Sequence, residues 1–186
     1  MSTPLYFSRF LVTEQVFFRS KYSFALVNLK PLVPGHVLVV PQRTTIYRLS
    51  DMSTEELNDY FHTVQLVQNF IKFQFKADSI NIAIQDGPEA GQSVPHLHTH
   101  IIPRYKLNNF GDEIYGKLDS WSFEQDWEQR RLNYVESGGR DKRREFSKPD
   151  DQRVEISKED MYKEALSLIG HMKSYLKEFP DMQKWL

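Results

Sequence analysis

Three histidines stand at every second position of one short segment, as His96, His98 and His100. The flanking residues, from 94 to 104, are typical of a strand. Alternate residues of a strand point to one face, so the three rings would form a row, whereas a helix would scatter them around its axis. Half of the six histidines of the chain lie within these five positions, which argues against chance. The row therefore predicts a functional face.

The chemistry of this row has three open interpretations: covalent catalysis, metal binding, or no function. A neutral imidazole is a good nucleophile toward phosphorus when its second nitrogen is held by a hydrogen bond, and neighbouring rings can donate to phosphate oxygens. Zinc could take two neighbouring rings, but all three would require a bent strand, because His96 and His100 lie roughly 13 Å apart at Cα in a straight one. Asp86 or Glu89 could approach as a further ligand.

The loop before the histidines reads DGPEAGQS, from Asp86 to Ser93, and connects two predicted strands. Glycine lets the backbone approach a ligand closely and adopt positive φ, and consecutive N–H groups in such a loop can form a nest that binds an anion. Gln92 and Ser93 add side-chain donors directly before the row. An ordinary turn is the alternative, but the position of the loop favours a phosphate site.

Three polar residues elsewhere could reach the same site. Gln85 ends the strand predicted before the loop, and it is either a phosphate contact or a structural amide. His36 follows Pro34 and Gly35, and it either reaches the site or satisfies a carbonyl of that turn. Asn28 ends its own predicted strand, where asparagine is more often a turn residue than a ligand.

Five strands and two helices are expected to position these residues. Ser53 followed by Glu56, and Ser157 followed by Asp160, mark the beginnings of the helices. The isoleucines at 80, 82 and 84 should share one face of their strand. The predicted strands are 16–18, 22–28, 36–41, 79–85 and 94–104. The predicted core positions of the helices are Leu57, Phe61, Val64, Val67 and Ile71, and then Met161, Ala165, Leu168, Met172, Leu176 and Phe179.

The bulk composition narrows the class of protein. A chain of 186 residues accommodates one globular domain with loops or a tail. The absence of cysteine excludes disulfides, thiolate metal sites and a cysteine nucleophile, and a net charge of −1 argues against a general attraction for nucleic acid. The beginning of the chain has no apolar run of signal-peptide length, and the aliphatic stretch 37–40 is too short to span a bilayer. These features predict an intracellular protein, cytoplasmic and also nuclear, without membrane or nucleic-acid partners.

The second part of the chain differs in composition from the first. Residues 116–186 are expected to form an extension to a core at 1–115, with a mobile charged loop at about 137–156 and a terminal helix. The loop carries a basic cluster, which is either an import or anion-binding patch or a solvated linker. The cluster consists of Arg140, Lys142, Arg143 and Arg144.

These segments together resemble the histidine-triad superfamily, whose signature is His-φ-His-φ-His-φ-φ with φ apolar. The segment HLHTHII at 96–102 matches this signature except at Thr99. The stretches SFALVNLKPLVPGHVLVVP at 23–41 and IQDGPEAGQSVPHLHTHIIPR at 84–104 look like the fragile-histidine-triad branch, which hydrolyses diadenosine polyphosphates. The clear resemblance covers about Tyr6 to Tyr115, and the insert and tail after it suggest a fungal-type member.

The resemblance implies a fold, a partner and a reaction. The fold is α+β, an antiparallel sheet of about five strands with a long helix packed on it. Members are usually homodimers whose sites are partly shaped by the partner. The implied reaction is ApppA + H2O → AMP + ADP through a covalent adenylyl-histidine. No cofactor bound by the protein is implied, although Mg²⁺ or Mn²⁺ could accompany the substrate phosphates.

The resemblance also implies catalytic roles for the histidines. His98 corresponds to the nucleophile, His96 to a residue whose carbonyl orients it, and His100 to a residue on the phosphates and the leaving group. His36 is implied to pack behind the site as a supporting residue. Thr99 should affect packing more than chemistry, because it faces away from the row. The implied substrate contacts are Asn28, Gln85, Gly91, Gln92, Ser93 and Val94, together with His100.

Other functions fit the same residues. One is an adenosine phosphoramidase of the same superfamily, and another is a signalling module in which the nucleotide-loaded complex is the output and slow hydrolysis resets it. The metal interpretation leads instead to a zinc-binding structural protein. Pro103, Arg104 and the loop at 86–92 favour the dinucleotide branch. The sequence does not indicate whether a triphosphate or a tetraphosphate bridge is preferred.

Overall fold

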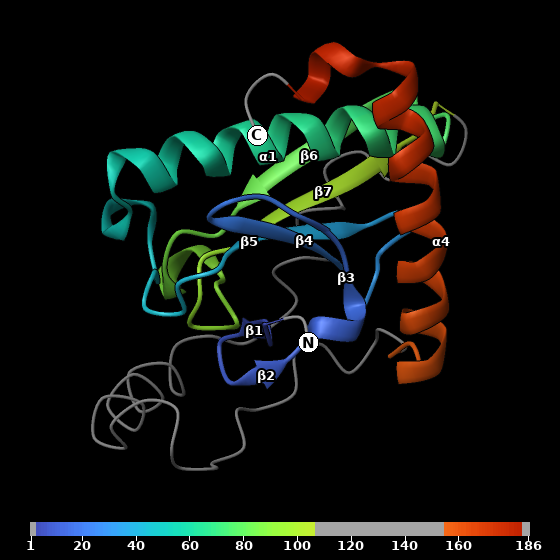
Figure 1. Ribbon diagram of the computed structural model, residues 1–186. Coiled ribbons are helices and arrows are strands. Elements are labelled where there is room, and N and C mark those ends of the chain that lie inside the picture. Colours follow the sequence, from blue (N-terminus) through green and yellow to red (C-terminus); the bar gives the residue numbers. More distant parts are fainter. Residues whose placement is uncertain (1–2, 107–154, 184–186) are drawn as a thin grey trace.

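The centre of the molecule is a sheet of five antiparallel strands in the order β3–β4–β5–β7–β6. The computed structural model describes residues 3–106 and 155–183. Helix α1 (Thr54–Gln74) lies along one face of the sheet, and helix α4 (Lys158–Glu178) runs beside β3 (Figure 1). The predicted α+β class is confirmed. The strands are β3 (Val16–Arg19), β4 (Ser23–Val27), β5 (Val37–Pro41), β6 (Ser79–Ile84) and β7 (Thr99–Arg104).

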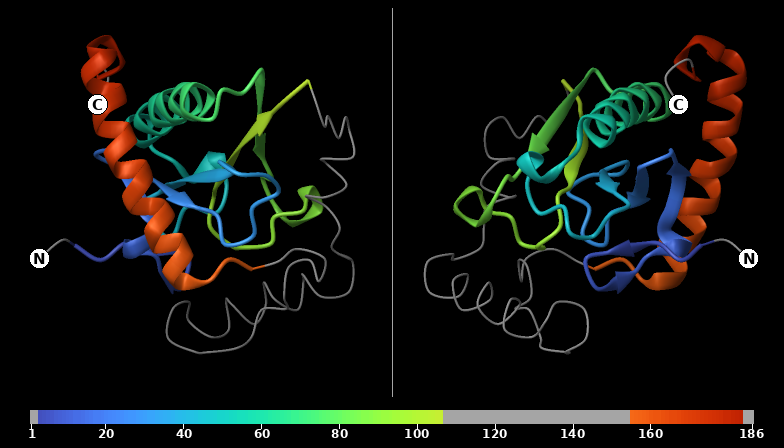
Figure 2. Two further views of the ribbon diagram at one scale, coloured as in Figure 1. Left: turned by 90° about the vertical axis from the view of Figure 1, so that its right-hand side faces the viewer. Right: turned by 60° about the vertical axis from the view of Figure 1, so that its left-hand side comes forward.

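A small hairpin and several short turns complete the described fold. The hairpin consists of β1 (Tyr6–Phe7) and β2 (Phe10–Leu11), and it lies on the side of the sheet away from α1 (Figure 2). Among the described residues, no helix combines the length and the apolarity needed to cross a bilayer. The 3₁₀ turns are Thr13–Gln15, Leu49–Asp51, Pro88–Ala90 and Pro180–Gln183.

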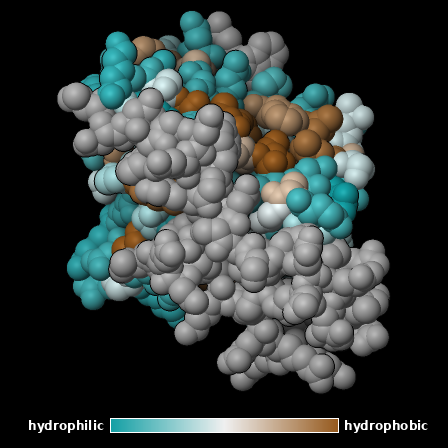
Figure 3. All heavy atoms as spheres, turned by 180° about the vertical axis from the view of Figure 1, so that it is seen from behind, coloured by the Kyte–Doolittle hydropathy of each residue, from teal (hydrophilic) through white to brown (hydrophobic). Residues whose placement is uncertain are grey.

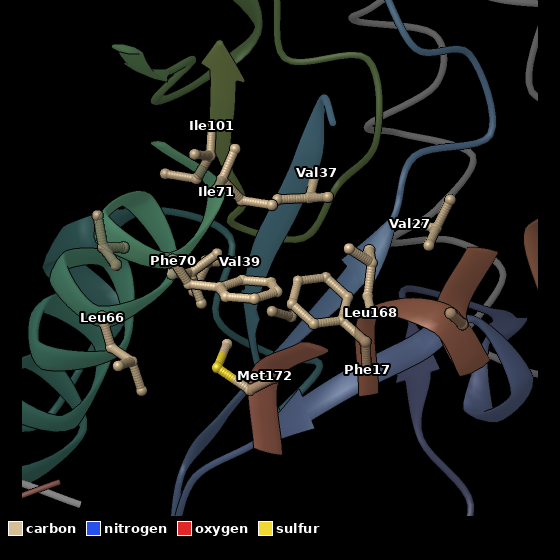
Figure 4. Packing of buried hydrophobic residues seen from close by; sticks show 14 of the residues in the cluster. Phe17, Val27, Val37, Val39, Leu66, Phe70, Ile71, Ile101, Leu168 and Met172 are labelled. Atoms are coloured by element: carbon tan, nitrogen blue, oxygen red, sulfur yellow. The ribbon is translucent and has the colours of Figure 1, made fainter. Parts of the chain in front are cut away.

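Apolar side chains cover both faces of the two central strands. On one face Phe17 of β3 and Phe70 of α1 turn toward each other at 6.2 Å between ring centroids, and Leu168 and Met172 of α4 lie beside them (Figure 4). β4 and β5 are buried along their whole length, which is why their sequences are continuous apolar runs rather than alternating ones. The cluster on the other face consists of Leu5, Val12, Phe24, Leu26, Leu38 and Val40.

Both predicted helix beginnings are confirmed. Ser53 Oγ accepts a hydrogen bond from the Glu56 N–H (3.2 Å), and the Glu56 carboxylate accepts one from the Ser53 N–H (2.9 Å). Ser157 Oγ accepts from the Asp160 N–H (3.1 Å). The first backbone N–H groups of a helix have no partner within the helix, so each side-chain acceptor stabilises the first turn.

The buried stripes of the helices differ from the predicted ones at particular positions. Phe61 is 44% exposed, whereas its neighbour Tyr60 is fully buried, because the Tyr60 hydroxyl finds hydrogen-bond partners in the Val39 carbonyl of β5 and the Thr99 hydroxyl of β7. In α4 the predicted core positions from Met161 to Met172 are buried, but Tyr175 rather than Phe179 continues the stripe. Tyr175 packs against Phe70, with 5.6 Å between ring centroids.

The strand β6 lies at the edge of the sheet, and this exposes one of its isoleucines. Ile80 and Ile84 pack against the core, but Ile82 is 49% exposed. The predicted boundary at 115/116 and the basic cluster lie outside the described residues, as does the predicted loop except for its last two residues.

The histidine strand is shorter than predicted. β7 begins at Thr99 rather than at Val94, so His96 and His98 precede it. Pro103 lies within the strand, which ends at Arg104 as predicted. The pairing of β7 with β5 stops at Ile101, while that with β6 continues. Proline is therefore tolerated at 103, because its missing N–H falls where β7 has passed the end of the β5 ladder.

Thr99 is the one departure from the histidine-triad signature, and its environment explains it. The hydroxyl groups of Thr99 and Tyr60 lie 2.6 Å apart, and the Tyr60 hydroxyl also donates to the Val39 carbonyl (3.1 Å). Burial raises the pKa of Tyr60, so its hydroxyl stays neutral. The polar group that replaces an apolar one in β7 is thus matched by a polar group of α1.

We predict that Tyr60→Phe destabilises the fold by about 1–3 kcal/mol, because it removes the partner of a buried hydroxyl. The double variant Tyr60→Phe/Thr99→Val should lose less than the sum of the two single variants, since the second change removes the unsatisfied group. Urea unfolding of the four proteins measures both quantities. Strict additivity would show that the two hydroxyls are not coupled.

Candidate active site

The chain segment that carries His96 and His98 crosses from the preceding loop to β7 without joining the sheet ladder. It is anchored by the Leu97 N–H, which donates to the Ile46 carbonyl (2.8 Å), and by the fully buried Leu97 side chain. The His96 N–H donates to the Val94 carbonyl (2.8 Å) in a tight turn. These contacts fix the backbone from which the histidine rings project.

His98 is oriented by the backbone of its own segment. Its Nδ1 lies 2.8 Å from the His96 carbonyl, which can only accept a hydrogen bond. Nδ1 must therefore carry the hydrogen, and the lone pair is left on Nε2. The ring is almost completely buried, and this burial lowers the pKa of His98, although the bond to the His96 carbonyl opposes the shift. His98 is thus a neutral imidazole with its nucleophilic nitrogen defined.

His100 is the opposite tautomer to His98, with its hydrogen on Nε2, and its contact with His36 determines this. The Leu32 N–H donates to His36 Nδ1 (3.0 Å), so the hydrogen of a neutral His36 is on Nε2. That Nε2 lies 2.9 Å from His100 Nδ1, which must accept, and the hydrogen of His100 is therefore on its own Nε2. Asn28 lies beside this pair, with its Nδ2 3.2 Å from His36 Nε2; because that Nε2 already donates to His100, Asn28 is a neighbour of the pair and not a further link in this chain of hydrogen bonds.

His96 is fully buried and is held from the N-terminal hairpin. The Ser8 N–H donates to His96 Nδ1 (2.9 Å), which places the hydrogen of a neutral His96 on Nε2. The Phe7 ring contacts both His96 and His98, with centroid distances of 5.7 and 5.2 Å. His96 thus contributes its carbonyl to His98 and its ring to the hairpin.

The three rings are brought together as the sequence pattern predicts, although not by one straight strand. The His98 and His100 ring centroids lie 5.0 Å apart, and the His36 and His100 centroids 5.1 Å apart. The Nε2 atoms of His96 and His100 therefore carry hydrogens, whereas Nε2 of His98, between them in the row, carries a lone pair. Such a row can place a nucleophile on one atom and hydrogen-bond donors on either side of it.

The glycine-bearing loop differs from the predicted anion nest. The N–H groups of Ala90, Gly91 and Gln92 donate to carbonyls of Gly87 and Pro88 within the loop, at 2.8–3.1 Å. The nest is therefore not formed by these three N–H groups. Contacts to an anion from this part of the chain must come from side chains or from residues after Gln92.

The loop is held instead against the connection between β5 and α1. The Asp86 carboxylate accepts from the Leu49 N–H (2.9 Å), and Gln92 Nε2 donates to the Tyr47 carbonyl (2.8 Å). Gly87 has φ +116°, and a Cβ there would lie 2.9 Å from the Arg48 guanidinium. Glycine is required at this position for its backbone conformation, whereas the Arg48 guanidinium, at the end of a flexible side chain, could move aside.

The two acidic residues considered as metal ligands are engaged in this loop. Asp86 bonds to Leu49, and Glu89 lies 3.9 Å from the Arg48 guanidinium. Within residues 3–106 and 155–183, no three side chains among His, Cys, Asp and Glu gather as a metal-binding group. The described geometry matches the catalytic interpretation better, because Nδ1 of His96 and of His100 accepts a hydrogen bond, which leaves a hydrogen rather than a metal-binding lone pair on Nε2 of both rings.

The other predicted substrate contacts differ in their surroundings. Gln85, directly after β6, is buried, and so is Gln92. Gly91, Ser93 and Val94 are half-buried along the path toward His96. The sequence patterns did not indicate Ser8 or Leu32, because both act through backbone N–H groups that any residue except proline supplies.

Comparison with known proteins agrees with this geometry. The family model for the HIT domain matches residues 10–107. The chain is 54% identical over its whole length, and over the whole length of the relative, to a bis(5'-adenosyl)-triphosphatase of Saccharomyces cerevisiae. It is 52% identical to a bis(5'-nucleosyl)-tetraphosphatase (asymmetrical) of Schizosaccharomyces pombe, over 64% of this chain and 65% of that one.

A solved structure is similar as well. The Plasmodium falciparum diadenosine triphosphate hydrolase in complex with cyclomarin A aligns with a TM-score of 0.55 and 34% identity, covering 64% of this chain and 84% of that chain. The chain belongs to the HIT domain family, the histidine-triad proteins that its signature resembles.

We predict that the His98 ring titrates below the ordinary histidine value of about 6.5, because burial disfavours its charged form. Below this value the unfolded chain binds a proton at His98 that the folded chain resists. This histidine should therefore make the fold less stable as the pH falls through 6.5 and below. Histidine NMR titration, with His98→Asn to assign the resonance, tests the shift. A midpoint above 6.5 would contradict it.

Proposed function

We propose that the protein hydrolyses diadenosine polyphosphates, chiefly ApppA to AMP and ADP, through a covalent adenylyl-histidine on His98. The observation that carries this proposal is the 2.8 Å bond between His98 Nδ1 and the His96 carbonyl. This bond leaves a lone pair on Nε2 of a buried ring between two other histidines. Family membership and the full-length similarity to a bis(5'-adenosyl)-triphosphatase support the substrate class.

The reaction would proceed in two displacements at one phosphorus atom. His98 Nε2 attacks the α-phosphorus, and the bond from that phosphorus to the bridging oxygen breaks as the N–P bond forms. ADP leaves, and the Nε2–H of His100 donates to the oxygen that takes up the charge. Water then attacks the same phosphorus, the N–P bond breaks, and AMP and the original His98 are released. No group on the protein is oxidised or reduced.

The remaining residues are proposed to position the substrate. Asn28 would contact a ribose, since it lies beside the His36–His100 pair. The phosphate contacts would come from Gln85 and from the path between Gly91 and Val94, which leads directly to His96. Because the N–H groups from Ala90 to Gln92 are already engaged within the loop, we assign the contacts there to the Ser93 side chain and the backbone after it.

The triphosphate is proposed as the main substrate rather than the tetraphosphate. The triphosphatase relative matches the whole chain, whereas the tetraphosphatase relative matches 64% of it. A divalent cation, Mg²⁺ or Mn²⁺, would arrive with the polyphosphate and neutralise part of its charge.

His98→Asn should keep the fold and lose turnover by about 10⁴-fold or more. Asparagine can still donate to the His96 carbonyl, but it offers no nucleophilic ring nitrogen. The measurement is product analysis with diadenosine tri- and tetraphosphate, combined with trapping of protein-bound AMP from labelled substrate. Turnover by the wild type without a trappable AMP adduct, or ordinary activity of the variant, would contradict the assignment of His98 as the nucleophile.

The same assay separates the alternative functions. Faster cleavage of an AMP-lysine amide than of ApppA would favour a phosphoramidase of the same family. Tight binding with very slow turnover would favour a signalling module in which the loaded complex is the output. His171→Gln, a change at an exposed position of α4, serves as the control for nonspecific effects of losing a histidine.

We also propose that the protein acts as a homodimer, in the cytoplasm with the nucleus as a second location. Apolar atoms gather on part of the surface seen from behind (Figure 3), and the edge strand β6 exposes Ile82. Such features are suited to contact with a second copy. Sedimentation should give twice the 22.0 kDa of one chain. A single 22.0 kDa species at micromolar concentration would contradict the dimer.

A further inference from the structure

We infer that the hairpin β1–β2 positions the nucleophile, with Phe7 and Ser8 as positioning residues for His98 and His96. This inference rests on the proposed function, because it assigns the residues that hold the proposed nucleophile in place. It adds to that function a part of the chain far from the histidine segment in sequence. The Ser8 N–H and His96 Nδ1 are joined across 88 residues.

The first contact acts on His96 and passes to His98. The Ser8 N–H holds the His96 ring at Nδ1, while the carbonyl of the same His96 holds the His98 ring at its Nδ1. His96 therefore links the hairpin to the nucleophile: its ring is bonded to Ser8, and its carbonyl is bonded to His98. A shift of the hairpin would change the position of the carbonyl that orients the nucleophile.

The conformation of Ser8 shows that this contact is imposed rather than incidental. Ser8 has φ +54°, a left-handed conformation that disfavours a residue with a Cβ, and it is buried. It stands in the turn between Phe7 and Phe10, which pair with each other in the hairpin. The surrounding contacts hold this conformation with its N–H on the His96 ring.

The second contact acts on His98 directly. The Phe7 ring stands edge-on to the His98 ring, with an interplanar angle of 77°, and also packs against His96. It limits rotation of His98 and excludes water from one side of it. In the part of the chain that the structure describes, the titratable neighbours of His98 are His96 and His100, with His36 behind His100, and Phe7 supplies an uncharged wall.

The hairpin can serve as a rigid support because it is tied to the sheet. The Val12 N–H donates to the Leu5 carbonyl (2.9 Å), and the Leu5 N–H donates to Thr13 Oγ1 (3.0 Å). Leu5 and Val12 are themselves buried in the cluster on that face of the sheet. The two ends of the hairpin are therefore fixed, and the turn at Ser8 is held over the histidines.

The test compares Phe7→Ala with Phe10→Ala in the full-length protein. Phe10 contributes a ring of the same size to the same hairpin, but it is 46% exposed and lies under the Arg9 guanidinium. Phe7→Ala should slow formation of the adenylyl-enzyme by about tenfold or more, with less change in KM, because a nucleophile held less precisely reacts more slowly. Phe10→Ala should leave this rate within about twofold of wild type.

The pH dependence supplies a second readout that a purely structural loss would not move. Opening His98 to water should shift the acid limb of adenylyl-enzyme formation toward pH 6.5 in Phe7→Ala and not in Phe10→Ala. Phe7→Leu, which keeps an apolar cover, should restore most of the rate and the original acid limb. The inference is overturned if Phe7→Ala matches Phe10→Ala, or if its effect is confined to KM.

Nitrogen NMR of the histidine rings tests the Ser8 contact without any substrate. Ser8→Gly keeps the N–H and suits the positive φ, so the His96 ring should retain its hydrogen on Nε2; Ser8→Val should disturb that signal because a β-branched residue resists this conformation. An unchanged His96 signal in Ser8→Val would contradict the inference. Absence of an AMP adduct in the wild type would instead contradict the proposed function, and the ring signals would still decide the role of the hairpin.

Discussion

A neutral imidazole carries one hydrogen on two nitrogens, so a buried histidine ring needs one acceptor and one donor, each at the correct nitrogen. In this protein a backbone group determines which nitrogen of each ring carries the hydrogen. The His96 carbonyl sets His98, the Leu32 N–H sets His36 and through it His100, and the Ser8 N–H sets His96. The alternation of donors and lone pair along the row is a consequence of where the main chain passes.

The fold makes these backbone groups available by keeping part of the histidine segment out of the sheet. A carbonyl within a regular strand bonds to the neighbouring strand. Because β7 begins only at Thr99, the His96 carbonyl can accept from the side chain two residues further along. The sheet begins just where it is needed to fix His100 against Leu38 and Thr99 against Val39. Tyr60 then ties the far side of β7 to α1.

Much of the fold and part of the site could be predicted from the sequence. Runs of apolar residues located β4 and β5, and serine with an acidic residue three positions later located both helix beginnings. The spacing of the histidines predicted that His98 and His100 lie together, and the family resemblance, rather than the residue pattern, placed His36 behind them. The start of β7 was not predicted, because His96 and His98 have the types and spacing of strand residues. The pattern also predicted Phe61 as a core residue where the structure buries Tyr60. This difference could not be predicted from the helix alone, because it depends on hydrogen-bond partners that other elements supply.

Helix α4 belongs to the part of the chain that is needed for a complete buried core. The family match ends at residue 107, yet Leu168 and Met172 lie in the same buried cluster as Phe17 and Phe70. Each such side chain, fully buried, contributes roughly 1.5–3 kcal/mol. A fragment cut at the family boundary would present that apolar surface to water and would be prone to self-association. Helix α4 is therefore an integral part of the packed core, although it lies beyond the residues that the family match covers.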